Sequence, residues 1–192
     1  MTLPTNGEGR PRVDGGGLQD QPVDTDSTTS SVPSGVHDAK LQQLLDHCKR
    51  GWRLLPIKDD KVSRIKWKNP EPGQSAATAD TAWVTRWYYE FPDTDWAVAL
   101  DDMFVVDVDK KYGGLDTLDE IEEHRPDLLN ATLTQLTPSG GYQFFYRQPP
   151  ELDIRNVPQK QLSTLAGMEI KGIGGYVGIP PSRGRRWLDA RE

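Results

Sequence analysis

The feature that most constrains the fold of this chain is the short apolar run Phe104–Asp109, which ends in two aspartates one residue apart. Such a run predicts a β-strand, in which successive side chains point to opposite faces. One face then consists of Phe104, Val106 and Val108, and the other of Val105, Asp107 and Asp109. The two carboxylates would stand about 6.6 Å apart along the backbone, with side chains able to converge.

Two like charges on one half-buried face need compensation, and a divalent cation is its usual source. Hard oxygen ligands favour Mg²⁺ or Mn²⁺. Asp107 and Asp109 are therefore candidate metal ligands. The same pattern also fits the solvated end of an ordinary strand, so the motifs that follow in the chain have to decide between the two interpretations.

Composition sets broad limits on the class of protein. A chain of 192 residues predicts one domain by default. Its single cysteine, Cys48, excludes an internal disulfide and favours a reducing compartment, so we expect a cytoplasmic protein. No apolar segment approaches the ~20 residues that span a bilayer, so no membrane partner is expected. The three histidines lack neighbouring soft ligands, which argues against a structural zinc site.

The formal net charge of −6 argues at first against a nucleic-acid partner, but the charge is unevenly distributed. Two basic clusters stand out, one of Lys58, Lys61, Arg64, Lys66 and Lys68 and one of Arg183, Arg185 and Arg186. Their alternative interpretation is an ordinary solvated face. If they bind DNA, the residues expected to follow the template backbone are Lys66, Lys68, Arg183, Arg185 and Arg186.

The chain divides into a tail and a domain. Residues 1–36 form an acidic segment rich in Gly, Pro, Ser and Thr, which cannot bury enough apolar area to offset its ordering entropy and is expected to be disordered. Residues 37–192 are expected to form the domain. Asp38 can cap a helix that ends at Gly51, and a strand is predicted over Trp52–Ile57. Thr78 or Asp80 opens a second helix.

The rest of the domain predicts further strands and a third helix. Trp96–Leu100 and Met103–Val108 are expected to form a hairpin around Asp101–Asp102, and a helix should follow Gly113–Gly114. Further strands are predicted over Thr132–Thr137, Tyr142–Arg147, Met168–Lys171 and Tyr176–Ile179. The pattern predicts an α+β domain with a largely antiparallel sheet.

Two further motifs bear on the chemistry. The turn Ser139–Gly140–Gly141 lies between two predicted strands, where paired glycines let backbone N–H groups approach a phosphate and the serine adds a hydroxyl donor. The same residues are also ordinary hairpin-turn chemistry. Glu169 and Lys171 share one face of a predicted strand, which offers a third carboxylate beside a cation or simply a cross-strand ion pair.

The order of these motifs resembles the bifunctional primase-polymerase (prim-pol) domain of the archaeo-eukaryotic primase superfamily, from about Leu41 to Trp187. The residues behind the resemblance are Val105–Asp109, Thr137–Gly141, Glu169–Lys171, Gly175–Val177 and Pro180–Ser182. Each fragment is unspecific, but the ordered set is specific.

The resemblance implies a primase-like fold with an RRM-like, largely antiparallel catalytic sheet flanked by helices. It also implies a DNA primase/DNA polymerase, a nucleotidyltransferase that makes or extends primers on a single-stranded DNA template from nucleoside triphosphates by two-metal-ion catalysis with Mg²⁺ or Mn²⁺. Carried over by position, the metal-binding acids would be Asp107, Asp109 and Glu169. The nucleotide-binding residues would be Ser139, Gly140, Gly141, Gln143 and Lys171. Relatives of this kind act in the replication of phages, plasmids or other mobile elements, often beside a helicase domain or subunit.

One residue departs from the family pattern. Gln143 stands where the family usually has a histidine that contacts the triphosphate. Glutamine can donate a hydrogen bond to a phosphate oxygen but cannot become charged or relay a proton. Two alternatives therefore stay open: a catalytically degenerate module that binds nucleotide or DNA, and a metal-dependent glycosyltransferase that uses the Asp-x-Asp pair.

Overall fold

The computed structural model describes residues 34–59, 61–65, 76–128 and 132–188, with side chains described from residue 39 onward. Contacts within the chain divide it into two units, Met1–Val32 and Pro33–Glu192, and all described residues belong to the second. Most of the expected disordered tail, residues 1–36, thus lies outside the described residues. None of the described helices combines the length and apolar character that a membrane crossing needs.

The described residues form three α-helices, eight strands and three short 3-10 turns. The helices are α1 (Ser34–Lys49), α2 (Thr81–Glu90) and α3 (Gly114–His124). The strands are β1 (Leu54–Ile57), β2 (Asp95–Ala99), β3 (Met103–Val108), β4 (Leu133–Leu136), β5 (Tyr142–Arg147), β6 (Met168–Lys171), β7 (Tyr176–Ile179) and β8 (Arg186–Leu188). The 3-10 turns are η1 (Lys110–Tyr112), η2 (Pro126–Leu128) and η3 (Gln159–Gln161).

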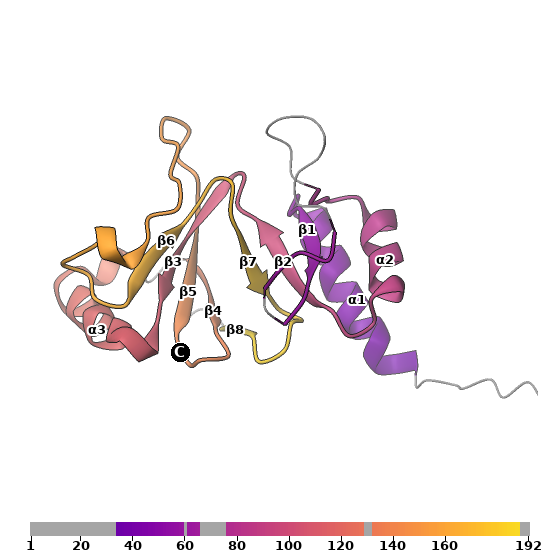
Figure 1. The fold of residues 1–192 in the computed structure, drawn as a ribbon, viewed down its shortest axis with the longest axis horizontal. Helices are drawn as coiled ribbons and strands as arrows, with labels where there is room; N and C mark the ends of the chain where they lie inside the picture. The colour runs from indigo at the N-terminus through magenta and orange to yellow at the C-terminus, as the bar shows by residue number, and fades with distance from the viewer. Residues whose placement is uncertain (1–33, 60, 66–75, 129–131, 189–192) are drawn as a thin grey trace, which may run out of the picture. The chain divides into compact units, whose positions relative to one another are not determined.

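The strands form two antiparallel sheets rather than one (Figure 1). The first has the order β1-β2-β7, and the second has the order β6-β3-β5-β4-β8. Helices α1 and α2 pack together beside β1, whereas α3 lies against β3 of the five-stranded sheet (Figure 1). This arrangement confirms the predicted α+β class and the antiparallel character of the sheet that contains Asp107.

The predicted hairpin of Trp96–Leu100 with Met103–Val108 is wrong. The connection instead takes the chain from the three-stranded sheet to the five-stranded one, because β2 pairs with β1 and β7 while β3 pairs with β5 and β6. Asp101 forms an ion pair with Arg53 next to β1, and the Asp102 carbonyl accepts a hydrogen bond from Gln148 after β5. The Asp-Asp pair also lacks the glycine that the favoured two-residue hairpin turns contain.

The helices follow their sequence signals, with one difference in length. Of the two predicted starts of α2, Thr78 and Asp80, the structure has Asp80 as the cap, since its side chain accepts a hydrogen bond from the Ala82 N–H. Helix α1 begins at Ser34, four residues before the predicted cap Asp38. Serine, like aspartate, is a residue type favoured at helix starts, so the sequence is compatible with the earlier start. The expected boundary between residues 36 and 37 falls inside this helix.

The main core lies where α1 and α2 meet both sheets. Leu44 of α1 and Val84 of α2 pack with Trp96 of β2, and Val105 of β3 and Phe145 of β5 belong to the same buried cluster. A second cluster covers the other face of β1 and β2, and a third lies under α3. Because the main cluster includes residues of both sheets, one core holds the two sheets together.

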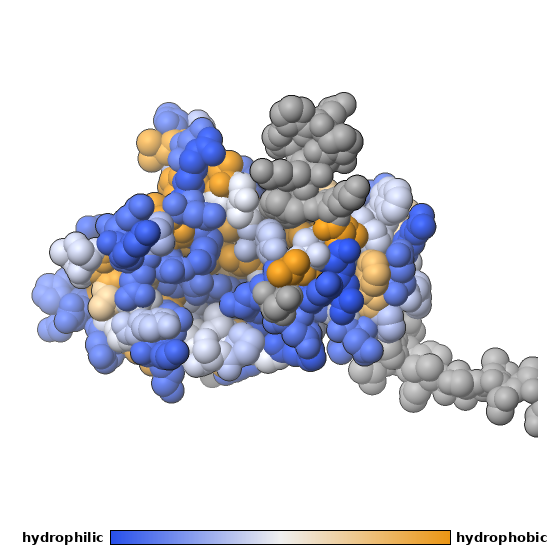
Figure 2. All heavy atoms as spheres, viewed as in Figure 1, coloured by the Kyte–Doolittle hydropathy of each residue, from blue (hydrophilic) through white to orange (hydrophobic). Residues whose placement is uncertain are grey.

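Apolar side chains on the face seen in Figure 2 form small patches within a mostly hydrophilic surface.

The two faces of β3 separate as the sequence predicts, but both are covered. Val108 is buried under α3, and Val106 packs against the same cluster, with Phe104 stacked on Tyr146. On the opposite face Val105 is fully buried in the main core, whereas Asp107 lines a cavity. On this face of β3, Val105 thus belongs to the core and Asp107, two residues later, to the cavity. The Asp107 carboxylate therefore lies at the edge of the hydrophobic core.

Candidate active site

The candidate site is built on one row of side chains that crosses the five-stranded sheet. Strand pairing sets Asp107 opposite both Gln143 and Glu169, Gln143 opposite Gln135, and Gln135 opposite Trp187. Directly opposed residues in antiparallel strands project from the same face. In strand order, this cross-strand row consists of Glu169, Asp107, Gln143, Gln135 and Trp187. It brings together three residues that the sequence analysis assigned to metal or nucleotide binding.

Asp107 is the acid of the site whose pKa is shifted by its surroundings. Burial raises the pKa of its carboxyl group above the usual value, and the hydrogen bond from Gln143 and the positive charge of Lys171 oppose that rise. The neighbouring charge of Glu169 raises the pKa further, and Lys61 lowers it. A half-buried carboxylate flanked by a second acid is an environment in which a bound cation would be stabilising.

Asp109 follows the end of β3, and its backbone is held at two points. Its N–H donates to the Gly167 carbonyl at 2.7 Å, and its carbonyl accepts from the Gly114 N–H at 3.0 Å. The Asp109 side chain accepts a hydrogen bond from the Lys111 N–H at 2.9 Å and so caps η1. These contacts keep the second carboxylate beside the cavity that Asp107 lines.

The Ser139–Gly140–Gly141 turn lies directly against the end of β3. Gly140 adopts a left-handed conformation with φ of +80°. A Cβ on Gly141 would lie 2.1 Å from the Val108 carbonyl oxygen, so glycine is required for this close approach. The Ser139 hydroxyl lies 3.1 Å from that of Thr137. The hairpin of β4 and β5 thus brings the predicted phosphate-binding turn to the aspartate pair.

Two adjoining cavities receive these residues. The larger has a volume of about 510 Å³ and is lined by the three predicted acids together with three cationic residues, namely Asp107, Asp109, Glu169, Lys61, Lys171 and Arg185. The smaller, of about 180 Å³, is lined by both aspartates, Ser139, Gln143, Lys61 and Arg185, among others. Ser139 thus lines the smaller cavity and Glu169 the larger one, while Asp107, Asp109, Lys61 and Arg185 line both.

Glu169 and Lys171 form an ion pair on β6. The pair lines the larger cavity, and both side chains are about one-third exposed. The sequence left open whether Lys171 faces phosphates or pairs with Glu169, and the structure shows the pairing. The role of Glu169 as a metal ligand stays a prediction.

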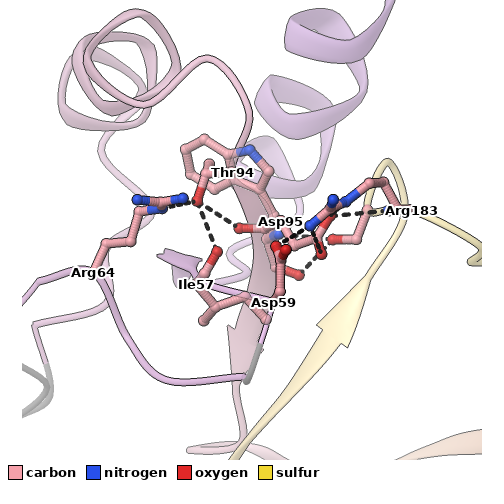
Figure 3. Close-up of polar contacts among 8 residues, drawn as sticks. Ile57, Asp59, Arg64, Thr94, Asp95 and Arg183 are labelled. Atoms are coloured by element: carbon pink, nitrogen blue, oxygen red, sulfur yellow. Dashed lines mark hydrogen bonds and ion pairs between the residues drawn. The ribbon is translucent and has the colours of Figure 1, made fainter.

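The three arginines of the second basic cluster have different environments. Arg183 forms ion pairs with Asp59 and with Asp95, the latter at 3.3 Å, while Arg64 donates to the Thr94 hydroxyl nearby (Figure 3). Arg186 is exposed on β8.

Arg185 differs from its neighbours because it points into the site. It donates to Gln143 Oε1 at 3.1 Å, and burial lowers the pKa of its guanidinium while Asp107 raises it. The guanidinium is therefore placed beside the aspartate pair. Lys66 and Lys68, the other predicted template contacts, lie outside the described residues.

A divalent cation fits this site by the chemistry of its donors. Asp107 and Asp109 offer hard carboxylate oxygens to one cavity, and Glu169 stands opposite Asp107 in the sheet. Within the described part of the chain, however, no three His, Cys, Asp or Glu side chains form a ready-made cluster. Glu169 is held by Lys171, so the two aspartates are the best candidates for first ligands.

Sequence reasoning missed several residues of the site. Lys61, Tyr112, Asn156, Gln159 and Tyr176 line the larger cavity, and Gln135 lies buried beneath it. Gln135 had a readable signal, because a hairpin closed at Ser139–Gly141 sets it opposite Gln143. The others come from 3-10 turns, loops and a strand end whose approach to Asp107 depends on tertiary packing.

Comparison with protein families agrees with this geometry. A family profile described as "Bifunctional DNA primase/polymerase, N-terminal" matches residues 44–192. No curated protein matched the chain. The matched range includes every described strand, the whole cross-strand row and all residues that line the two cavities. The chain therefore belongs to the bifunctional DNA primase/polymerase (Prim-Pol) family.

Proposed function

We propose that this chain is a DNA-dependent nucleotidyltransferase that makes or extends primers on single-stranded DNA. The observation that supports the proposal most is the meeting of Asp107, Asp109 and the Ser139 turn at one cavity, within a domain of the Prim-Pol family. Antiparallel pairing of all eight described strands disfavours the glycosyltransferase alternative, which expects a parallel nucleotide-binding sheet.

The cavities suit a nucleoside triphosphate in size and charge. A volume of about 510 Å³ lies within the range of roughly 300–1,000 Å³ typical of small-molecule sites. Lys61 and Arg185 supply positive charge beside Ser139, where a triphosphate would need it. We therefore assign Arg185 to the incoming nucleotide rather than to the template, because it lies inside the cavity.

In the proposed mechanism, Asp107 and Asp109 would hold Mg²⁺ or Mn²⁺, with Glu169 as a further ligand. A metal ion held by these carboxylates would neutralise triphosphate charge and lower the pKa of the primer 3′-hydroxyl. Lys61, Arg185 and the Ser139 hydroxyl then orient the phosphates so that the 3′-hydroxyl oxygen can attack the α-phosphorus and pyrophosphate can leave. Lys171 adds positive charge at the edge of the cavity while it remains paired with Glu169.

Template binding is assigned to the exposed Arg186 together with Lys66 and Lys68. Arg183 is a weaker candidate than the sequence predicted, because two aspartates already pair with it. Binding through phosphates should weaken as salt concentration rises. A role in the replication of a mobile element, with a helicase as partner, remains a proposal from the family resemblance.

Primer extension with Asp107→Asn tests the proposal. The wild type, supplied with a primed single-stranded template, dNTPs and Mg²⁺ or Mn²⁺, should extend the primer. Asp107→Asn keeps the size of the side chain but removes its charge, and we expect extension to fall by at least about a hundredfold. The matched control is Asp153→Asn, an exposed aspartate paired with Arg155, which should extend like the wild type.

Absence of extension by the wild type with either metal would contradict the catalytic proposal. If nucleotide or DNA binding persisted in that case, the result would favour the degenerate binding module that Gln143 leaves open. Equal extension by Asp107→Asn and wild type would instead show that the chemistry lies elsewhere.

A further inference from the structure

Two glutamines in the cross-strand row are buried beneath the candidate site. Gln135 is 0% exposed and Gln143 is 5% exposed. Burying an amide is costly unless its donors and acceptors are paired. The proposed mechanism gives no role to Gln135, which lies one strand further from the aspartates than Gln143.

The two amides form a branched hydrogen-bond network. Gln135 Nε2 donates to Gln143 Oε1 at 2.6 Å and to the Gly178 carbonyl at 2.8 Å. Arg185 Nη1 donates to the same Gln143 Oε1 at 3.1 Å. The Gln143 side chain in turn makes a hydrogen bond to Asp107.

The Gly178 carbonyl and the Arg185 guanidinium fix the orientation of the two glutamine amides. A backbone carbonyl can only accept, so the Gln135 atom that faces Gly178 must be its NH₂ group. A guanidinium can only donate, so the Gln143 atom that faces Arg185 must be its carbonyl oxygen. With that oxygen directed at two donors, the NH₂ group of Gln143 is turned toward Asp107 and the cavity.

The network also joins the two sheets. Gln135 belongs to β4 of the five-stranded sheet, and Gly178 belongs to β7 of the three-stranded sheet. A Cβ on Gly178 would lie 2.8 Å from Arg185 Nε, so the guanidinium rests directly on the glycine backbone. The two groups that donate to Gln143 Oε1 thus both contact Gly178 of β7. These contacts hold the Gln143 amide in one orientation.

We propose that Gln135 is a positioning residue that, together with Arg185, holds the Gln143 carbonyl so that the Gln143 NH₂ group faces Asp107 and the nucleotide phosphates. One N–H then serves Asp107, and the second is directed to a phosphate oxygen. The contact between the Gln143 NH₂ group and a phosphate rests on the proposed function, whereas the orientation of the Gln143 amide does not.

Two substitutions of Gln135 separate positioning from simple packing. Gln135→Glu has the same shape but replaces the NH₂ donor with an acceptor, so it favours the reversed Gln143 amide, against Arg185, which still donates to the carbonyl oxygen. Gln135→Met keeps the length without any hydrogen bond, so Gln143 is released but not reversed. Gln148→Glu makes the same chemical change just beyond β5, away from both cavities, and serves as the control.

The first readout is the dNTP concentration dependence of primer extension, with thermal unfolding measured alongside. We expect Gln135→Glu to raise KM about tenfold, the value of one hydrogen bond to a charged group, while kcat changes less. Gln135→Met should raise KM by a smaller factor, and Gln148→Glu should leave KM unchanged. Wild-type KM in folded Gln135→Glu and Gln135→Met proteins would overturn the proposal, whatever their unfolding temperatures.

The second readout needs neither activity nor the Glu variant. Side-chain amide resonances of Gln143 in ¹H–¹⁵N spectra report whether its NH₂ group is fixed. We expect a rigid, slowly exchanging pair in the wild type and an averaged, faster exchanging pair in Gln135→Met. Identical Gln143 resonances in the two proteins would overturn the positioning role. If the wild type incorporates no nucleotide, the proposed function fails, and this comparison still decides the role of Gln135.

Discussion

His47 shows how a single buried side chain makes stability depend on pH. Its ring is 3% exposed and is stacked on Trp52 with 4.9 Å between ring centroids. Neither ring nitrogen has a hydrogen-bond partner among the described residues. Burial, with help from the Arg50 charge, lowers the pKa of His47 to about 4, while the nearby Pro180 backbone and the Asp46 charge act in the opposite direction.

This environment predicts that the protein loses stability in mild acid. Because the folded state keeps His47 neutral while the unfolded chain protonates near its ordinary pKa of 6.5, stability falls as pH drops from about 6.5 to about 4. The loss from this residue should reach about 3 kcal/mol and then stop. Urea unfolding of wild type and His47→Phe across this range measures it. A phenylalanine variant with the same pH dependence as the wild type would contradict the assignment.

Two serines from sequence motifs have opposite roles. Ser182, in the Pro180–Ser182 motif, is buried, and its hydroxyl both accepts from the Trp96 N–H at 2.7 Å and donates to the Trp96 carbonyl at 2.9 Å. Ser139 is exposed at the cavity. The Ser182 hydroxyl therefore satisfies backbone groups of β2. The serine of the Pro180–Ser182 motif thus has a structural role.

Alanine substitutions should separate these roles. Ser182→Ala leaves two buried backbone groups without their partner, and we expect the free energy of unfolding to fall by about 2 kcal/mol. Ser139→Ala should change stability by less than about 0.5 kcal/mol. It should nevertheless raise the dNTP KM in primer extension. Equal stability loss in the two variants, measured by urea unfolding, would argue against this division.

At the scale of elements, the sequence predicted those whose ends are marked by local chemistry. Asp80 identified the start of α2, and the Ser139–Gly141 turn identified the pairing of β4 with β5. The connection at Asp101–Asp102 has no such chemistry and was wrongly interpreted as a hairpin. Whether β2 pairs with β3 or with β7 depends on contacts between residues that are far apart in the sequence. A local sequence pattern does not predict such contacts.

The same limit explains what was found and missed in the site. Asp107 and Glu169 lie on strands whose alternation can be predicted from sequence, Asp109 directly follows one of them, and the structure brings all three to one cavity. Arg185 and Lys61 come from connecting segments, so their positions depend on how the two sheets meet. Arg185 was expected to contact the template, and in the structure its guanidinium donates to Gln143, a contact that the sequence pattern did not predict.

At the scale of the whole described unit, the main core includes residues from both sheets and from α1 and α2. Such a shared core predicts one cooperative unfolding transition. Val105→Ala, at a fully buried position, should lower stability by about 2 kcal/mol and shift tryptophan fluorescence and far-UV circular dichroism together. Val62→Ala, at a position 52% exposed, should shift neither. Separate transitions for the two signals would show that the sheets unfold independently.

The central claim, templated nucleotidyl transfer at the Asp107 cavity, is tested most directly by incorporation of single dNTPs opposite each of the four template bases. We predict that only the complementary nucleotide is added, that chelation of the metal stops addition, and that Asp107→Asn abolishes it while Asp153→Asn does not. Addition that ignores the template base, or that survives in Asp107→Asn, would contradict the claim.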